Sequence, residues 1–185
     1  MRIARYRALL IAGGALSLAT ASDAFVFLAL YGRVGLPASV FPLLFVGVSA
    51  VFTVLAAPLG RLADRTGRGR VLLAGYAMLL GVYALVLGPL GGWVLVAAAL
   101  ALLGGYYAAT DGVLMALGSA VVPEPVRGSG LALLRTTTSA ARLLAGIAFG
   151  AVWTVWGSHA AFATFAIALA AAGLISARAL VATAS

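Results

Sequence analysis

Six long apolar runs follow one another along this chain, and only short breaks separate them. The runs cover about residues 8–31, 39–59, 71–88, 92–121, 127–153 and 159–181. Each is near or above the roughly 20 apolar residues that a helix needs to cross the hydrocarbon core of a bilayer. Glycine, proline or charged residues mark the breaks, as expected where helices end at a membrane face. The pattern predicts an all-α membrane protein, with six transmembrane helices forming one domain over residues 1–185.

The composition excludes a soluble globule. Hydrophobic residues make up 64% of the chain and charged residues only 9%, which is too little polar surface to cover a water-soluble fold. The chain has no cysteine, so it forms neither disulfides nor thiolate metal sites. Neither a phosphate-binding glycine loop nor a cluster of metal ligands is present. Ser129 and His159 start different spans at opposite faces, too far apart for a serine nucleophile and its base. We therefore expect no enzyme activity and no cofactor.

The arginines indicate how the chain sits in the membrane. All twelve basic residues are arginine, and the net charge is +8. With the spans above, one face holds Arg2, Arg5, Arg7, Arg61, Arg65, Arg68, Arg70, Arg127 and Arg178. Only Arg33 falls at the other face, so the positive-inside rule predicts cytoplasmic termini in a cell (inner) membrane. The charge then serves contact with the lipid bilayer and not with nucleic acid. Trp93, Trp153 and Trp156 are expected in an aromatic belt at the opposite face.

The segment Gly60–Arg70 is the only strongly polar passage in the middle of the chain, and we expect it to be a loop. It resembles the G-x-L-a-D-r-x-G-r-k signature of the major facilitator superfamily, which joins the second and third helices of each six-helix half. The matching residues are Gly60, Leu62, Asp64, Arg65, Gly67, Arg68 and Arg70. The resemblance implies a conformational latch, in which Asp64 holds a helix start of the other half. The alternative is that the arginines only anchor orientation on the anionic leaflet.

A second resemblance lies around the fourth and fifth runs. Asp111–Leu114 and Val122–Leu131 are similar to the tenth span, the loop and the start of the eleventh span in one group of bacterial facilitator proteins. Ser22–Phe25 in the first run fits the same group. The resemblance therefore covers nearly the whole chain and implies the C-terminal six-helix half of such a transporter. Its expected partner is a second six-helix half, either another copy of this chain or a separate chain.

An internal repeat is also expected. Thr20–Asp23 is similar to Ala109–Asp111, and a proline follows each carboxylate a dozen or so residues later, at the end of the run. The first run crosses outward and the fourth inward. The halves of the domain, about 8–88 and 92–181, would thus be inverted repeats of three helices each, as in many transporters.

Four ionisable residues lie inside the runs, where a charge costs at least a few kcal/mol unless a partner, a cavity or a function offsets it. They are Asp23, Asp111, Arg135 and Arg142. At about 1.5 Å per residue, Asp111 and Arg135 lie roughly 12–15 Å from the cytoplasmic end, and Asp23 and Arg142 roughly 22 Å from it. Depth therefore predicts that Asp111 pairs with Arg135 and that Asp23 pairs with Arg142.

Two interpretations of these residues stay open. They form structural ion pairs, or they bind a proton or a small-molecule substrate in a polar cavity. Arg135, Ser139 and Arg142 recur on one face of their helix, and Tyr107 adds a polar group beside Asp111. Arg135 is also near enough to the membrane face to extend its charge to water.

The predicted function is secondary active transport of a small solute, proton-coupled and in the direction of efflux, by one half of a transporter. The predicted binding residues are Asp23, Tyr107, Asp111, Arg135, Ser139 and Arg142. Two alternatives are a non-transporting membrane module that binds a full-length transporter and an inactive fragment of a split gene.

Overall fold

The computed structural model describes the backbone of residues 2–182 and the side chains of residues 5–177. The described part is helical apart from short connections, and it contains no strand. Its helices are α1 (Arg2–Leu18), α2 (Asp23–Val34), α3 (Phe41–Thr66), α4 (Arg68–Leu87), α5 (Gly92–Val121) and α6 (Arg127–Ala182). Single 3-10 turns, η1 (Ala38–Val40) and η2 (Glu124–Val126), precede α3 and α6. Five helical stretches within the described residues are long and apolar enough to cross a membrane. The prediction of a helical membrane protein is confirmed at this level.

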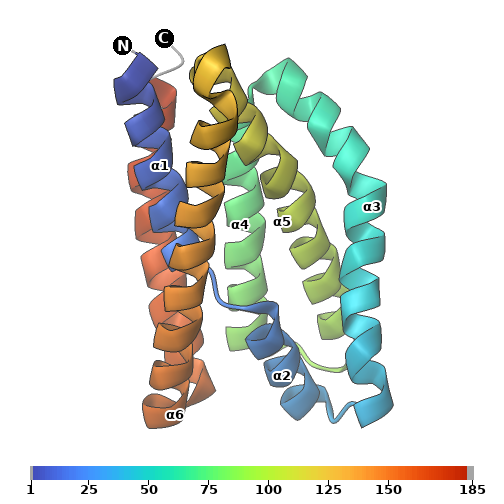
Figure 1. Ribbon diagram of the computed structural model, residues 1–185. Coiled ribbons are helices and arrows are strands. Elements are labelled where there is room, and N and C mark those ends of the chain that lie inside the picture. The colour runs from blue at the N-terminus through green and yellow to red at the C-terminus, as the bar shows by residue number, and fades with distance from the viewer. Residues whose placement is uncertain (1, 183–185) are drawn as a thin grey trace.

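The last helix, α6, doubles back on itself. It contains 56 residues, which at about 1.5 Å per residue would measure about 84 Å, far more than a bilayer. Gly157 interrupts it with φ 84° and ψ 170°, values that are not helical. Figure 1 shows the two arms of α6 running in opposite directions, so that the end of α6 returns to the end of the bundle where α1 begins. The break expected around residues 156–159 is therefore a single glycine.

The first span is not the continuous helix predicted over 8–31. α1 ends at Leu18, and α2 starts at Asp23 after the non-helical link Ala19–Ser22. The four side chains of the link, from Ala19, Thr20, Ala21 and Ser22, are all small, so the link fits inside the bundle. Its backbone N–H and C=O groups need hydrogen-bond partners there. The Ala21 N–H donates to the Tyr83 hydroxyl at 2.7 Å, and that hydroxyl donates to the Ala19 carbonyl at 3.3 Å.

The loop predicted at Gly60–Arg70 is also wrong in form. α3 continues to Thr66 and α4 begins at Arg68, so Gly67 alone lies between them. Its φ of 105° and ψ of 127° are easily reached only by glycine. Arginine, leucine and alanine in the segment favour a helix, and charge does not end a helix that leaves the membrane.

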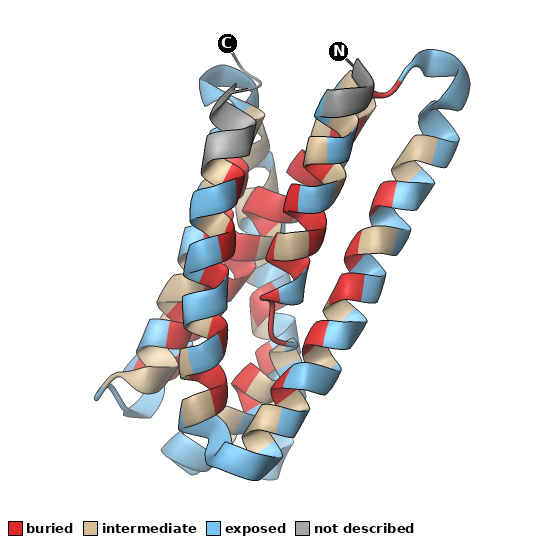
Figure 2. Ribbon diagram, turned by 90° about the vertical axis from the view of Figure 1, so that its left-hand side faces the viewer, coloured by how far each residue is buried: buried red, intermediate tan, exposed pale blue. Residues whose placement is uncertain are grey.

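The helices pack in close pairs around a buried interior. α3 and α4 pack chiefly on α5, and α1 packs chiefly on α6. A Cβ built at Gly104 on α5 would lie 2.5 Å from the Val51 Cβ on α3, and one built at Gly75 on α4 would lie 2.7 Å from the Thr110 Cγ2 on α5. Small residues therefore bring these helices together, as in other membrane bundles. In Figure 2 the buried residues gather on inward faces and the exposed residues on outward faces.

The tryptophans divide into two kinds. Trp93 and Trp156 are 62% and 69% exposed, and both lie at the end opposite the helix starts of α1 and α6, as an aromatic belt would require. Trp153 differs, because its ring is half-buried and packs against Phe25 and Phe162 with centroid distances of 5.6 and 6.0 Å. Trp153 lines a pocket with Arg33, Ser158 and His159 at the same end of the bundle, so its place in the belt stays a prediction.

Candidate functional site

The break in the first span opens onto a cavity of about 650 Å³. Its walls come from the α1–α2 link and the start of α2, from α3, α5 and the first arm of α6. The lining residues are Thr20, Ala21, Ser22, Asp23, Ala24, Phe25, Phe45, Tyr107, Arg142, Leu143, Gly146 and Ile147. We call it the central cavity. Its volume lies within the roughly 300–1,000 Å³ typical of sites for drug-sized ligands.

Asp23 owes its position in the cavity wall to the helix break. It is the first residue of α2, where a negative side chain is favoured by the helix dipole. The Tyr107 hydroxyl on α5 donates to its two carboxylate oxygens at 2.8 and 2.7 Å. Among the described residues no cation lies within 4.0 Å of this carboxylate. The predicted Asp23 and Tyr107 therefore meet, and a neutral donor holds the carboxylate.

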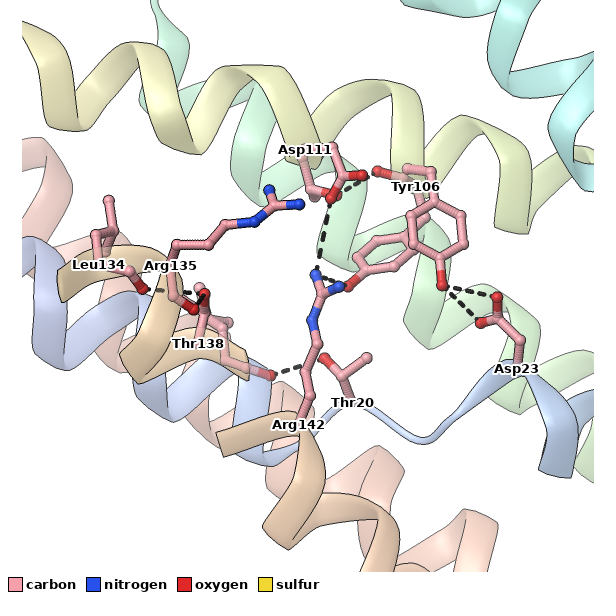
Figure 3. Close-up of polar contacts among 11 residues, drawn as sticks. Thr20, Asp23, Tyr106, Asp111, Leu134, Arg135, Thr138 and Arg142 are labelled. Carbon is pink, nitrogen blue, oxygen red and sulfur yellow. Dashed lines mark hydrogen bonds and ion pairs between the residues drawn. The ribbon is translucent and has the colours of Figure 1, made fainter. Parts of the chain in front are cut away.

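Arg142 pairs with Asp111, which corrects the pairing predicted from depth. Its Nη2 lies 3.9 Å from Asp111 Oδ1 and 3.5 Å from the Tyr106 hydroxyl. Figure 3 shows the guanidinium between Asp111 and Tyr106, away from Asp23. Side chains on a helix lean toward its N-terminus, and α6 begins at the end of the bundle nearer to Asp111. Depth along a helix gives only the position of the backbone, and the first span is in fact broken between α1 and α2.

Arg135 and Ser139 line a smaller cavity beside the Arg142–Asp111 pair. This cavity has a volume of about 70 Å³, and Asp111 and Arg142 line it too. In Figure 3 the Arg135 side chain extends toward Asp111, but no ion pair joins them among the described residues. Arg135 and Ser139 are exposed. The predicted stripe on α6 therefore faces this small polar cavity, and Arg142 lines both it and the neighbouring central cavity.

The segment expected to form a latch lies at the end of the bundle that carries most arginines. Asp64 Oδ1 accepts from Arg68 Nη2 at 3.0 Å, with the two side chains 63% and 38% exposed. The Arg68 Nη1 also donates to the Ala116 carbonyl of α5 at 3.0 Å. Gly60, Asp64 and Arg68 line a cavity of about 230 Å³ against α5, whereas Arg65, Gly67 and Arg70 are exposed. Within this chain Asp64 is thus bound by its own segment.

Sequence reasoning missed two polar anchors of the broken span. Tyr83 forms hydrogen bonds with the backbone of the Ala19–Ser22 link, as described above. Arg33, at the other end of α2, donates to the carbonyls of Val86 and Gly88, and so caps the C-terminus of α4. The signal for Arg33 in the sequence was that it is the one arginine expected at the face opposite the termini. The signal for the break was Ser22 followed by Asp23, residues typical of a helix start.

Comparison of the chain with protein-family models, with curated proteins and with solved structures found no match.

Proposed function

We propose that the chain is one six-helix half of a secondary active transporter of the major facilitator type. The transported species is a small solute, moved outward across the cell membrane in exchange for protons. The observation that carries the proposal is Asp23, which starts a half-helix and presents a carboxylate to the central cavity. Broken helices that place a polar group beside a cavity within the membrane are a common construction in secondary transporters.

The proposal includes six crossings, because α6 would cross twice around Gly157. Both termini and the Gly60–Arg70 segment then lie in the cytoplasm, in agreement with the positive-inside rule. Residues 8–88 and 92–181 form the two inverted repeats. Asp111 and Arg142 belong to the proton-coupling group, with Arg135 and Ser139 beside them, and Asp23 and Tyr107 face the solute.

A second six-helix half is part of the proposal. The central cavity is bordered by exposed apolar side chains, with Phe45, Leu143 and Ile147 exposed by 44%, 67% and 63%. A charged cavity open toward lipid is unfavourable, whereas a facing half would cover it and leave an aqueous path. The two halves would then rock around the site between them and open it to each side of the membrane in turn.

The ion pair between Arg142 and Asp111 favours a second candidate, a non-transporting module whose paired charges only lock the bundle. The two candidates differ in what the carboxylates do. In a transporter at least one of Asp23 and Asp111 exchanges its proton during the cycle, and in a module neither does.

Proteoliposomes that contain the purified protein and a trapped pH dye discriminate these candidates. We expect proton movement when one member of a panel of sugars, carboxylates, amino acids and amines is added on one side. Asp111→Asn should abolish the movement, and Glu124→Gln, which alters an exposed carboxylate in η2, should preserve it. If no solute of the panel moves protons, or if Asp111→Asn retains full movement, the proposed coupling is wrong.

A further inference from the structure

The two charged side chains in the wall of the central cavity do not pair with each other. Asp23 and Arg142 are the two charged side chains in its wall. The Arg142 guanidinium lies against Asp111 and the Tyr106 hydroxyl, at 3.9 and 3.5 Å. Asp23 receives hydrogen bonds from the neutral Tyr107 alone among the described residues. Arg142 is therefore directed to Asp111, toward which Arg135 also extends, and the Asp23 carboxylate faces the central cavity without an ion pair among the described residues.

The rest of the wall is largely apolar. Phe25 at the start of α2 and Phe45 on α3 contribute aromatic rings, and Leu143 and Ile147 on α6 contribute aliphatic side chains. An aromatic face near a carboxylate favours a cation with apolar substituents, because the ring attracts the charge and also packs against the substituents. Such a wall gives no advantage to a sugar, which needs several hydrogen-bond partners.

The size of the cavity argues against the smallest cations. A proton needs no cavity, and a metal ion would leave most of 650 Å³ empty. The described residues also contain no group of three or more metal-ligating side chains. A hydrated metal ion would moreover lie against apolar walls that cannot replace its water.

We propose that the central cavity binds a hydrophobic organic cation of drug-like size, with the Asp23 carboxylate as its counter-ion. This inference rests on the proposed transport function and names the substrate class of the same site. Tyr107 keeps the carboxylate oriented toward the cavity. Phe25 and Phe45 surround the apolar substituents, while Arg142 remains bound to Asp111. The positive charge of the ligand supplies the ion-pair partner that Asp23 lacks among the described residues. An anion of the same shape should therefore be rejected.

Two ions of nearly identical shape and opposite charge test this inference. Radiolabelled tetraphenylphosphonium and tetraphenylborate are dialysed to equilibrium against the full-length protein in lipid nanodiscs, and binding to empty nanodiscs is subtracted. We expect saturable binding of tetraphenylphosphonium and none of tetraphenylborate. Asp23→Asn should weaken the binding by about tenfold or more, since it removes the counter-ion. Asp23→Glu should restore most of it, and Glu124→Gln should leave it unchanged.

Three results would overturn the inference. They are equal binding of the two ions, binding that survives Asp23→Asn, and no saturable binding of the cation. The comparison of the two ions uses unaltered protein, so it holds even if Asp23→Asn does not fold.

The experiment separates failure of this inference from failure of the proposed function. If an uncharged or anionic solute moves protons in proteoliposomes and tetraphenylphosphonium does not bind, the substrate class is wrong and transport stands. If tetraphenylphosphonium binds through Asp23 and no solute moves protons, the cation site stands and the transport function is wrong.

Discussion

The hydroxyl of Tyr83 lies 2.7 Å from the backbone nitrogen of Ala21. A side chain of α4 therefore provides a hydrogen-bond partner for the backbone of the broken first span. The same hydroxyl also donates to Ala19. Tyr83 is fully buried. Its ring packs 5.7 Å from that of Phe162, measured between centroids.

We therefore predict that Tyr83→Phe destabilises the protein through the hydroxyl alone. It would leave the buried Ala21 N–H without a partner, at a cost of about 1–3 kcal/mol. Reversible unfolding in mixed micelles measures this loss. Tyr31→Phe is the matched control, because the described residues give its hydroxyl no hydrogen bond. A loss no greater than that of Tyr31→Phe would show that the link does not depend on Tyr83.

A second prediction concerns the pairing of Arg142. In double-mutant cycles for unfolding, Arg142→Gln and Asp111→Asn should be coupled by about 0.5–1 kcal/mol, a value reduced by the partial exposure of both side chains. Arg142→Gln and Asp23→Asn should be coupled less, because Tyr107 and not Arg142 binds Asp23. Stronger coupling to Asp23 would restore the pairing expected from depth.

Two glycines should respond oppositely to enlargement. A Cβ at Gly146 would meet nothing within 4 Å, and Gly146 lines the central cavity. Gly146→Leu should therefore preserve stability and weaken tetraphenylphosphonium binding by filling the space. Gly104→Ala should instead cost about 1–3 kcal/mol of stability, because Val51 already occupies the position of the new methyl group. Unaltered cation binding in Gly146→Leu would place the cation elsewhere.

The proposed second half leads to a crosslinking prediction. If the chain works as a homodimer, Asp64 of one copy approaches the helix start at Gly128–Leu131 of the other, where the dipole favours an anion. The chain has no cysteine, so Asp64→Cys with Ser129→Cys gives a clean pair. We expect a disulfide between copies in membranes. Asp64→Cys with Ser158→Cys, whose positions lie at opposite ends of the bundle, should give none. A disulfide within one copy, or a monomeric protein, would exclude this dimer.

The sequence predicted the helical membrane class and most helix ends, because glycine, proline and charge act locally. It did not predict the break at Ala19–Ser22, since those small residues are apolar enough to continue a span, and their polar partner, Tyr83, is distant in sequence. The pairing of Arg142 was wrong for a similar reason. Depth along a helix follows from residue number, whereas the direction of a long side chain depends on which helices are neighbours.

The tight turn at Gly67 has a mechanical consequence. A single residue joins α3 to α4, and Arg68 ties the start of α4 to the Ala116 carbonyl near the end of α5. A displacement of the exposed end of α3 should therefore also displace the start of α4 and the end of α5. The three helices are thus tied together at this end of the bundle, while Tyr83 ties the Ala19–Ser22 link to α4 deeper inside it.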